Sequence, residues 1–77
     1  MELYKNLSTK SEVSAFEIGN DFVKVKFRNN RKIYVYSYRK IDRHKIDQMK
    51  LLAVSGRGLG TFINQNRDVH DGFELEP

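Results

Sequence analysis

The sequence predicts a small α+β domain, in which an antiparallel meander sheet of three or four strands is packed by one amphipathic helix, with a short second helix. Two observations predict this class. Apolar and basic residues alternate over residues 22–28, a period of two that is typical of a strand with one buried face. Further along, Ile46, Met49, Leu52 and Ala53 approximate the apolar stripe of a helix. Because the strands come first and the helices follow, the order indicates α+β rather than a parallel α/β sheet.

The chain has 77 residues, which suffices for one compact domain but not for two independent cores. We therefore expect a single domain over residues 1–77, with its core in residues 11–69. Residues 1–11 are polar with scattered apolar positions, and both a lead-in strand and a loose arm remain open. Residues 70–77 are polar and acidic without periodicity, so disorder is one interpretation of this tail.

The first two predicted strands form a hairpin. Residues 13–18 make the first strand, where Phe16 and Ile18 lie two apart and suit one buried face. Gly19 and Asn20 follow as a turn dipeptide that tolerates positive φ. The second strand, residues 22–28, shows the clearest alternation in the chain.

The sequence of the second hairpin allows two strand registers, which differ in the sheet face to which its tyrosines point. Asn29 and Asn30 suit a two-residue type I′ turn, which pairs Val25 with Tyr34 and places the tyrosines on the apolar face. A three-residue loop would exchange the faces of the third strand and set Tyr34 and Tyr36 beside the lysines as a base-stacking platform. We favour the two-residue loop, because so small a domain has few large apolar groups for its core.

The predicted core collects the apolar face of the strands and the apolar stripe of the helices. Its members are Phe16, Ile18, Val23, Val25, Phe27, Tyr34, Tyr36, Ile46, Met49 and Phe62.

The helical part of the chain begins after residue 41. Asp42 is a suitable N-cap for a helix that ends near Ser55 and Gly56, and Thr61 suits the start of a short second helix. The glycine-rich loop between them has two interpretations: a phosphate-binding loop or an ordinary helix-capping loop. The residues of this candidate phosphate loop are Gly56, Arg57, Gly58 and Gly60. Capping is favoured, because the loop follows a helix and its GxGxG spacing is not the dinucleotide fingerprint.

Taken together, several short motifs resemble the KTSC domain family over residues 11–69. They are Ile18-Gly19 at the first turn, Val23, Val25 and Phe27 on the second strand, Tyr34-Val35-Tyr36 as the central Tyr-x-Tyr, and the segment from Gly60 to Asn64. The chain departs from the family pattern at Asn20-Asp21, where an aromatic-Asp pair is usual. It also departs at Asp42, where a proline is usual, and at Gly58, where a serine is usual.

The KTSC resemblance implies a small module of the kind found alone in bacterial and phage proteins and at the C-terminus of some lysyl-tRNA synthetases. The usual proposal for that family is RNA binding, and the resemblance does not suggest catalysis.

Charge supports the same expectation. The net charge is +4, and nine Lys or Arg but only one acid, Asp42, lie between residues 24 and 45. We predict an RNA-binding or other nucleic-acid-binding surface on the basic sheet face and the helix start. Its residues are Lys24, Lys26, Arg28, Arg31, Lys32, Arg39, Lys40 and Arg43. The alternative is a solvated face whose lysines protect the sheet against aggregation.

A second functional interpretation is a protein-interaction module. In the favoured register Ile33 and Val35 are apolar residues on the outward sheet face, where they suit a homodimer or another protein partner.

Other classes have little support in the sequence. There is no cysteine, and neither His44 nor His70 has a second ligand at metal spacing, so we expect no metal site and no cofactor. Nothing marks a nucleophile or a perturbed carboxylate, so we expect no enzyme activity and no catalytic residue. Because there is no membrane-length apolar run and no signal-peptide pattern at the N-terminus, we expect no membrane partner and a cytoplasmic location.

Overall fold

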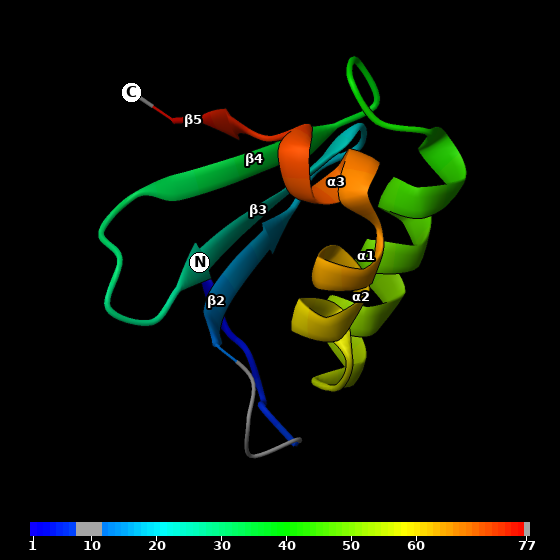
Figure 1. Cartoon of the computed structure of the whole chain (residues 1–77). Coiled ribbons are helices and arrows are strands. Elements are labelled where there is room, and N and C mark those ends of the chain that lie inside the picture. The colour runs from blue at the N-terminus through cyan, green and yellow to red at the C-terminus, as the bar shows by residue number, and fades with distance from the viewer. Residues whose placement is uncertain (8–11, 77) are drawn as a thin grey trace.

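The computed structural model describes residues 1–7 and 12–76, and over these residues it shows a five-stranded antiparallel sheet with three helices (Figure 1). The strands are β1 (Glu2–Leu3), β2 (Val13–Ile18), β3 (Phe22–Phe27), β4 (Ile33–Ser37) and β5 (Glu74–Leu75), and they lie side by side in that order. The helices are α1 (Arg43–Ser55), α2 (Leu59–Gln65) and α3 (Arg67–Asp71). The α+β class is confirmed, but the sheet has more strands than the three or four that we predicted.

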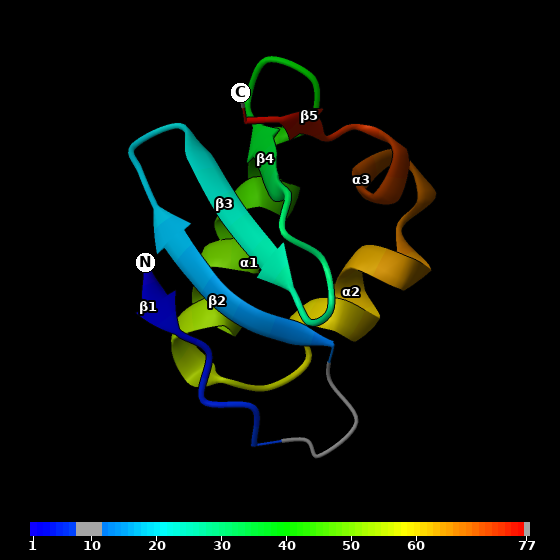
Figure 2. The ribbon, with the colours of Figure 1, turned by 90° about the vertical axis from the view of Figure 1, so that its left-hand side faces the viewer.

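The helices lie on one side of the sheet. Figure 1 shows α1, α2 and α3 grouped on the same side, and in Figure 2 the strands lie in front of α1, with their other face toward the viewer. We call this second face, which none of the three helices covers, the open sheet face.

The two outer strands come from the ends of the chain. β1 pairs with β2 through Glu2 and Phe16, and β5 pairs with β4 through Leu75 and Tyr34. The interpretation of residues 70–77 as a disordered tail is therefore wrong for residues 70–76, while Pro77 lies outside the described residues. Such two-residue strands are too short to show a period in the sequence.

The second hairpin has the register that we favoured. Val25 pairs with Tyr34 and Val23 with Tyr36, so the tyrosines share the helix-covered face with the valines and the lysines point to the open sheet face. The loop is longer than the predicted turn, because the ladder stops at Ile33 and residues 28–32 connect the strands.

Asn30 organises the longer loop. Its side-chain oxygen accepts a hydrogen bond from the amide of Lys32 at 2.9 Å, inside the segment that connects the two strands. Only Asn29 has positive φ, at 61°, whereas a type I′ turn needs positive φ at both central residues.

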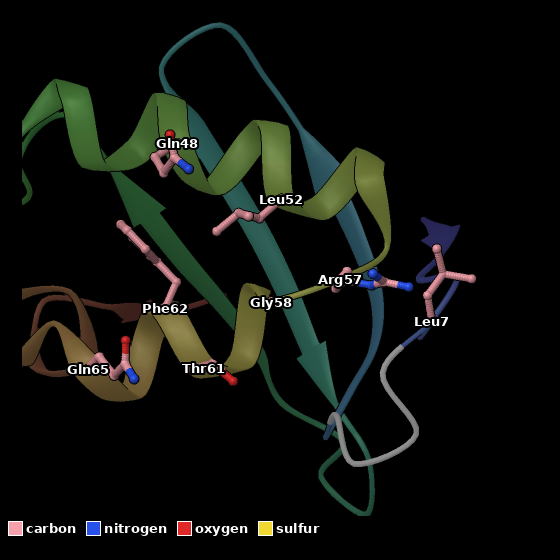
Figure 3. Close-up of a pocket in the computed structure, with 8 residues that line it drawn as sticks. All are labelled: Leu7, Gln48, Leu52, Arg57, Gly58, Thr61, Phe62 and Gln65. Carbon is pink, nitrogen blue, oxygen red and sulfur yellow. The ribbon is translucent and has the colours of Figure 1, made fainter.

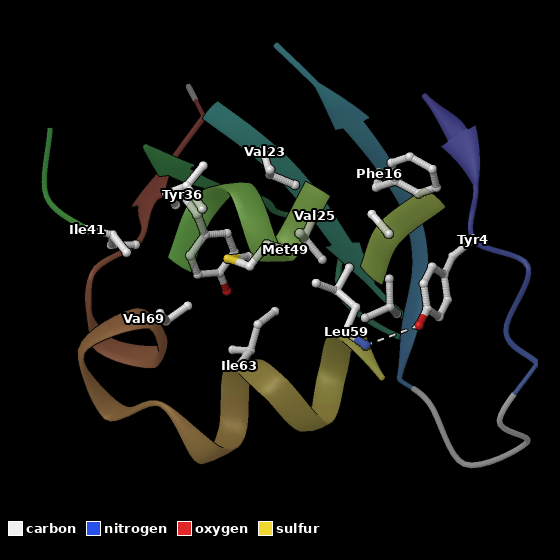
Figure 4. Close-up of a cluster of buried hydrophobic side chains, with 13 residues drawn as sticks. Tyr4, Phe16, Val23, Val25, Tyr36, Ile41, Met49, Leu59, Ile63 and Val69 are labelled. Carbon is white, nitrogen blue, oxygen red and sulfur yellow. Dashed lines mark hydrogen bonds between the residues drawn. The ribbon is translucent and has the colours of Figure 1, made fainter. Parts of the chain in front are cut away.

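The core lies between the sheet and the helices, and most of the predicted core is buried there (Figure 4). Phe27, Tyr34 and Phe62 are only partly buried against it. The prediction that Ile18 belongs to the core is wrong, because this residue is 38% exposed. It lies at the end of β2, beyond the last residue that β1 covers.

The core also contains residues that we did not predict. They are Tyr4, Val13, Ile41, Leu59, Ile63 and Val69, and all are buried. Tyr4 connects the N-terminal segment to the start of α2, since its hydroxyl accepts a hydrogen bond from the Leu59 amide at 3.2 Å (Figure 4).

The turns and caps follow the sequence in part. Asp42 occupies the N-cap position of α1 as predicted, although its side chain makes no capping hydrogen bond, and Gly56 ends that helix with φ of 78°. Thr61 is not a cap, because α2 already starts at Leu59 after Gly58. At the first turn Gly19 makes room for an aromatic ring: a Cβ there would lie 2.0 Å from Cε2 of Phe22.

Candidate functional site

The predicted basic surface is divided in space. Arg31 and Lys32 lie in the β3–β4 loop (residues 28–32), and Arg39 and Lys40 lie in the turn between β4 and α1. These two groups are at opposite ends of β4, which is roughly 17 Å long for a five-residue strand. The eight predicted residues therefore extend along the whole length of β4 and are not gathered at one end of it.

One of the two lysines on the open sheet face, Lys24, is paired with acidic side chains. Lys24 forms an ion pair with Glu76, and its Nζ lies 3.8 Å from Glu17 Oε2. The hydrogen bond to Glu76, with smaller contributions from the charges of Glu76 and Glu17, raises the pKa of Lys24 against the opposing effect of burial. Lys26 lies on the same face, between Ala15 and Ile33. The sheet face thus carries acids as well as bases.

At the β4–α1 end, Arg43 is engaged by an aromatic ring. Its guanidinium carbon lies 5.2 Å from the centre of the Tyr38 ring, and Lys50 Nζ lies 5.1 Å from the same centre. The Tyr38 hydroxyl donates a hydrogen bond of 2.5 Å to Asp47 and, as the largest cause, lowers the pKa of that carboxyl. This cluster joins the end of the sheet to α1.

The other end of β4 carries a pocket with aromatic walls, which we call the aromatic pocket. It has a volume of about 370 Å³ and is lined by Glu12, Phe27, Tyr34, Tyr36, Ile63, Asn64, His70 and Phe73. Tyr34 stands between two other rings: its ring centre is 5.2 Å from that of Phe27 at 88° and 4.6 Å from that of Phe73 at 51°. The strands, α2, α3 and the segment before β5 each contribute to this pocket.

The β3–β4 loop is anchored on residues of the aromatic pocket. The Asn30 side-chain amide donates a hydrogen bond of 3.0 Å to the Tyr34 hydroxyl, and the Arg28 amide donates one of 2.7 Å to the Glu12 carbonyl. The exposed side chains of Arg31 and Lys32 follow in the same loop. The structure thus brings together a group of basic residues and an aromatic-lined hollow.

Polar groups also line the aromatic pocket. Tyr36 is only 2% exposed, and its burial, with a smaller effect of Tyr34, raises the pKa of its hydroxyl well above the ordinary value. This hydroxyl therefore stays protonated at neutral pH. His70 Nδ1 lies 2.9 Å from Asp71 Oδ1, a contact that lowers the pKa of Asp71.

The glycine-rich loop acts mainly as a connector between helices. The Gly56 amide donates to the Leu52 and Ala53 carbonyls, and the Leu59 amide donates to the Tyr4 hydroxyl. The Arg57 amide donates to the Ser55 hydroxyl. Two of the four candidate residues, Gly56 and Arg57, thus already use their amides within the loop, which favours the capping interpretation over the phosphate-binding one.

A second hollow of about 620 Å³ lies between α1 and α2 (Figure 3). Its lining combines apolar side chains with amides and one guanidinium: Leu7, Gln48, Leu52, Arg57, Gly58, Thr61, Phe62 and Gln65. Figure 3 shows Leu52 and Phe62 on facing helices, with Arg57 and Leu7 at one end. The partial exposure of Phe62, which we expected in the core, follows from its place in this groove.

The described part of the chain shows neither a metal-binding cluster nor a membrane-spanning helix. No group of three or more His, Cys, Asp or Glu side chains is placed there to hold a metal ion. No helix among residues 1–7 and 12–76 is long and apolar enough to cross a membrane.

Comparisons with family models, with curated proteins and with solved structures find no match to this chain. The resemblance to the KTSC family therefore stays a prediction that rests on the motifs quoted above.

The sequence pattern missed several residues of the aromatic pocket, namely Glu12, His70 and Phe73 as pocket residues and Asn30 as the anchor of the loop. One signal was available: Phe73 is a large aromatic residue in a segment that is otherwise polar. In a tail without periodicity, such a residue indicates a docking point on the rest of the fold.

Proposed function

We propose that this protein binds single-stranded nucleic acid through the β3–β4 loop and the neighbouring aromatic pocket. RNA is the class that the KTSC resemblance implies. One observation carries the proposal: exposed Arg31 and Lys32 lie in a loop that is hydrogen-bonded to the wall of an aromatic-lined pocket. Single-stranded nucleic acid offers both matching groups, phosphates for the basic side chains of the protein and unstacked rings for its aromatic walls.

The location differs from the one that charge alone suggested. Lys24 on the open sheet face is paired with Glu76 and Glu17, and Arg43 lies over the Tyr38 ring. A phosphate would compete with these internal contacts there. Arg31 and Lys32 are exposed, and among the described residues neither forms an ion pair with an acidic side chain. These two residues can therefore contact phosphate without giving up an ion pair. Arg39 and Lys40 are equally exposed, so what distinguishes the loop is its connection to the aromatic pocket.

The proposal is tested by fluorescence anisotropy with a labelled single-stranded RNA of about ten nucleotides, titrated at several salt concentrations. We expect binding that weakens with salt and is largely abolished in the double variant Arg31→Glu, Lys32→Glu. The salt slope should become shallower by roughly 0.7 for each phosphate that the variant no longer binds.

The matched control is the double variant Arg39→Glu, Lys40→Glu, which changes the net charge equally at the other end of β4. It should retain most of the affinity. Equal losses in both double variants would mean that binding follows net charge and not the loop. Absence of binding at low salt would overturn the proposal.

A second candidate function is self-association through the open sheet face. The observation that favours it is the row that Leu3, Ala15, Lys26 and Ile33 form across that face, with Leu3 82% exposed and the neighbouring Val35 half-buried. A second copy of the chain could cover this row face to face. Edge-to-edge pairing is less favourable, because the outer strands β1 and β5 have only two residues each.

Sedimentation equilibrium tests this second candidate. A dimer that becomes monomeric in Ile33→Lys, with the helix-side variant Leu51→Lys unchanged, would support it. A wild-type protein that remains monomeric at high concentration would exclude it.

A further inference from the structure

We infer that the aromatic pocket takes up one unstacked nucleobase, and that the Tyr36 hydroxyl makes a hydrogen bond to that base. This inference rests on the proposed function and extends it from the phosphates to the base.

The first support is the difference in hydrogen bonding among the four tyrosine hydroxyls. Tyr4 accepts a hydrogen bond from Leu59, Tyr34 accepts one from Asn30 and Tyr38 donates one to Asp47. In the described part of the chain the Tyr36 hydroxyl alone makes none, although Tyr36 is the fully buried member of the set at 2% exposure. A buried tyrosine hydroxyl usually has a partner.

The second support is where the Tyr36 hydroxyl lies. Among the described residues, no side-chain nitrogen or oxygen that is fully withdrawn from solvent lacks a hydrogen-bond partner. The unpartnered Tyr36 hydroxyl must therefore keep contact with open space, and Tyr36 lines the aromatic pocket. Figure 4 shows the hydroxyl pointing away from the sheet on the side of Ile63, another residue of the pocket lining.

The third support is the chemistry of the walls. Phe27, Tyr34 and Phe73 provide aromatic surface for a planar ring, and a volume of about 370 Å³ lies within the range of small-molecule sites. Glu12, Asn64 and His70 provide hydrogen-bonding side chains along the same lining. An aliphatic ligand would leave the Tyr36 hydroxyl without a partner, whereas the edge of a nucleobase offers both donors and acceptors.

The fourth support is the position of the charges. The loop that carries Arg31 and Lys32 is fastened to Tyr34, which is a wall of the pocket. A nucleotide whose base enters the pocket would have its phosphates near this loop. The two sources of such a base are a nucleic-acid strand and a free nucleotide, and the strand is favoured because several phosphates can meet the loop at once.

The test uses the full chain, Tyr36→Phe and two single-stranded probes, an oligoadenylate and a strand of the same length with abasic sites. We expect the wild type to bind the oligoadenylate more tightly than the abasic strand. Tyr36→Phe, which removes only the hydroxyl, should lose about 3- to 10-fold in affinity for the oligoadenylate and nothing for the abasic strand. The control Tyr38→Phe, which loses a hydroxyl at the far end of β4, should bind both strands as the wild type does.

The outcomes separate the two proposals. If the wild type binds both strands equally, or if Tyr36→Phe binds the oligoadenylate unchanged, the base-pocket inference is overturned. Strand binding that the Arg31→Glu, Lys32→Glu variant still abolishes would then leave the proposed function standing. If adenosine monophosphate binds as tightly as the strand and needs the Tyr36 hydroxyl, the pocket assignment stands and the strand-binding function is overturned. If neither strand nor nucleotide binds, both proposals fail.

Discussion

The side-chain amide of Asn30 donates a 3.0 Å hydrogen bond to the hydroxyl of Tyr34, and this bond joins the β3–β4 loop to the aromatic wall of the pocket. The side-chain oxygen of the same residue accepts the Lys32 amide at 2.9 Å. The Asn30 side chain thus holds the loop through two hydrogen bonds, one to the pocket wall and one to the loop backbone. The positions of Arg31 and Lys32 depend on these bonds.

The first prediction concerns this anchor. Asn30→Ala removes both hydrogen bonds and should lower the free energy of unfolding by about 1–2 kcal/mol, since each net bond contributes about 0.5–1.5 kcal/mol. It should also weaken RNA binding, because the basic side chains lose their fixed position. Urea unfolding and fluorescence anisotropy measure the two effects. Asn29→Gly is the control: Asn29 has φ of 61°, which glycine adopts readily, so its stability should be unchanged or slightly higher.

The second prediction concerns two neighbouring positions of α1. Met49 is fully buried between the helices and the sheet, whereas Leu51 is 67% exposed. Met49→Ala should lower the free energy of unfolding by about 2–5 kcal/mol through the cavity that it leaves, a large part of the stability of so small a domain. Leu51→Ala should change it by less than about 0.5 kcal/mol. Equal unfolding midpoints for the two variants would show that α1 does not pack on this face.

The sequence predicted those parts of the fold in which local pattern and tertiary packing agree. The alternation in β3 predicted both the strand and its buried face, and the volume needed for a core predicted the pairing of Val25 with Tyr34. β1 and β5 escaped prediction, because two residues have no period and their pairing depends on strands far away in the chain. The aromatic pocket was missed for a similar reason: Glu12, Tyr34 and Phe73 meet only once both ends of the chain are in place.

The third prediction concerns the link between α1 and α3. Lys45 Nζ lies 2.8 Å from both carboxylate oxygens of Asp68, and this hydrogen bond is the main cause that lowers the pKa of Asp68 from 3.8. Because the pKa is lower in the folded state, the stabilisation is present above the unfolded value and is lost as the pH falls through the folded one. Asp68→Asn should therefore unfold at a lower temperature than the wild type at neutral pH, and the gap should close at strongly acidic pH.

The control for the Asp68→Asn variant is a substitution of its ion-pair partner, Lys45. Lys45→Met should show the same pH dependence of the difference in melting temperature, because it removes the same ion pair. A gap that persists unchanged in acid would assign the effect of Asp68→Asn to helix packing and not to the ion pair.

The last prediction concerns the buried hydroxyl of Tyr36 at alkaline pH. Burial raises the pKa of this group above the ordinary tyrosine value of 10.0. The unfolded chain then loses the proton first, so the contribution of Tyr36 to stability is fully present below that value and is lost as the pH rises toward the folded pKa. In this window the free energy of unfolding should fall by about 1.4 kcal/mol per pH unit on account of Tyr36. Urea unfolding of the wild type and of Tyr36→Phe, measured at neutral and at alkaline pH, should show a larger alkaline loss for the wild type. Equal losses would mean that the Tyr36 hydroxyl is well hydrated in the folded protein, which would also remove the argument that it awaits a partner in the aromatic pocket.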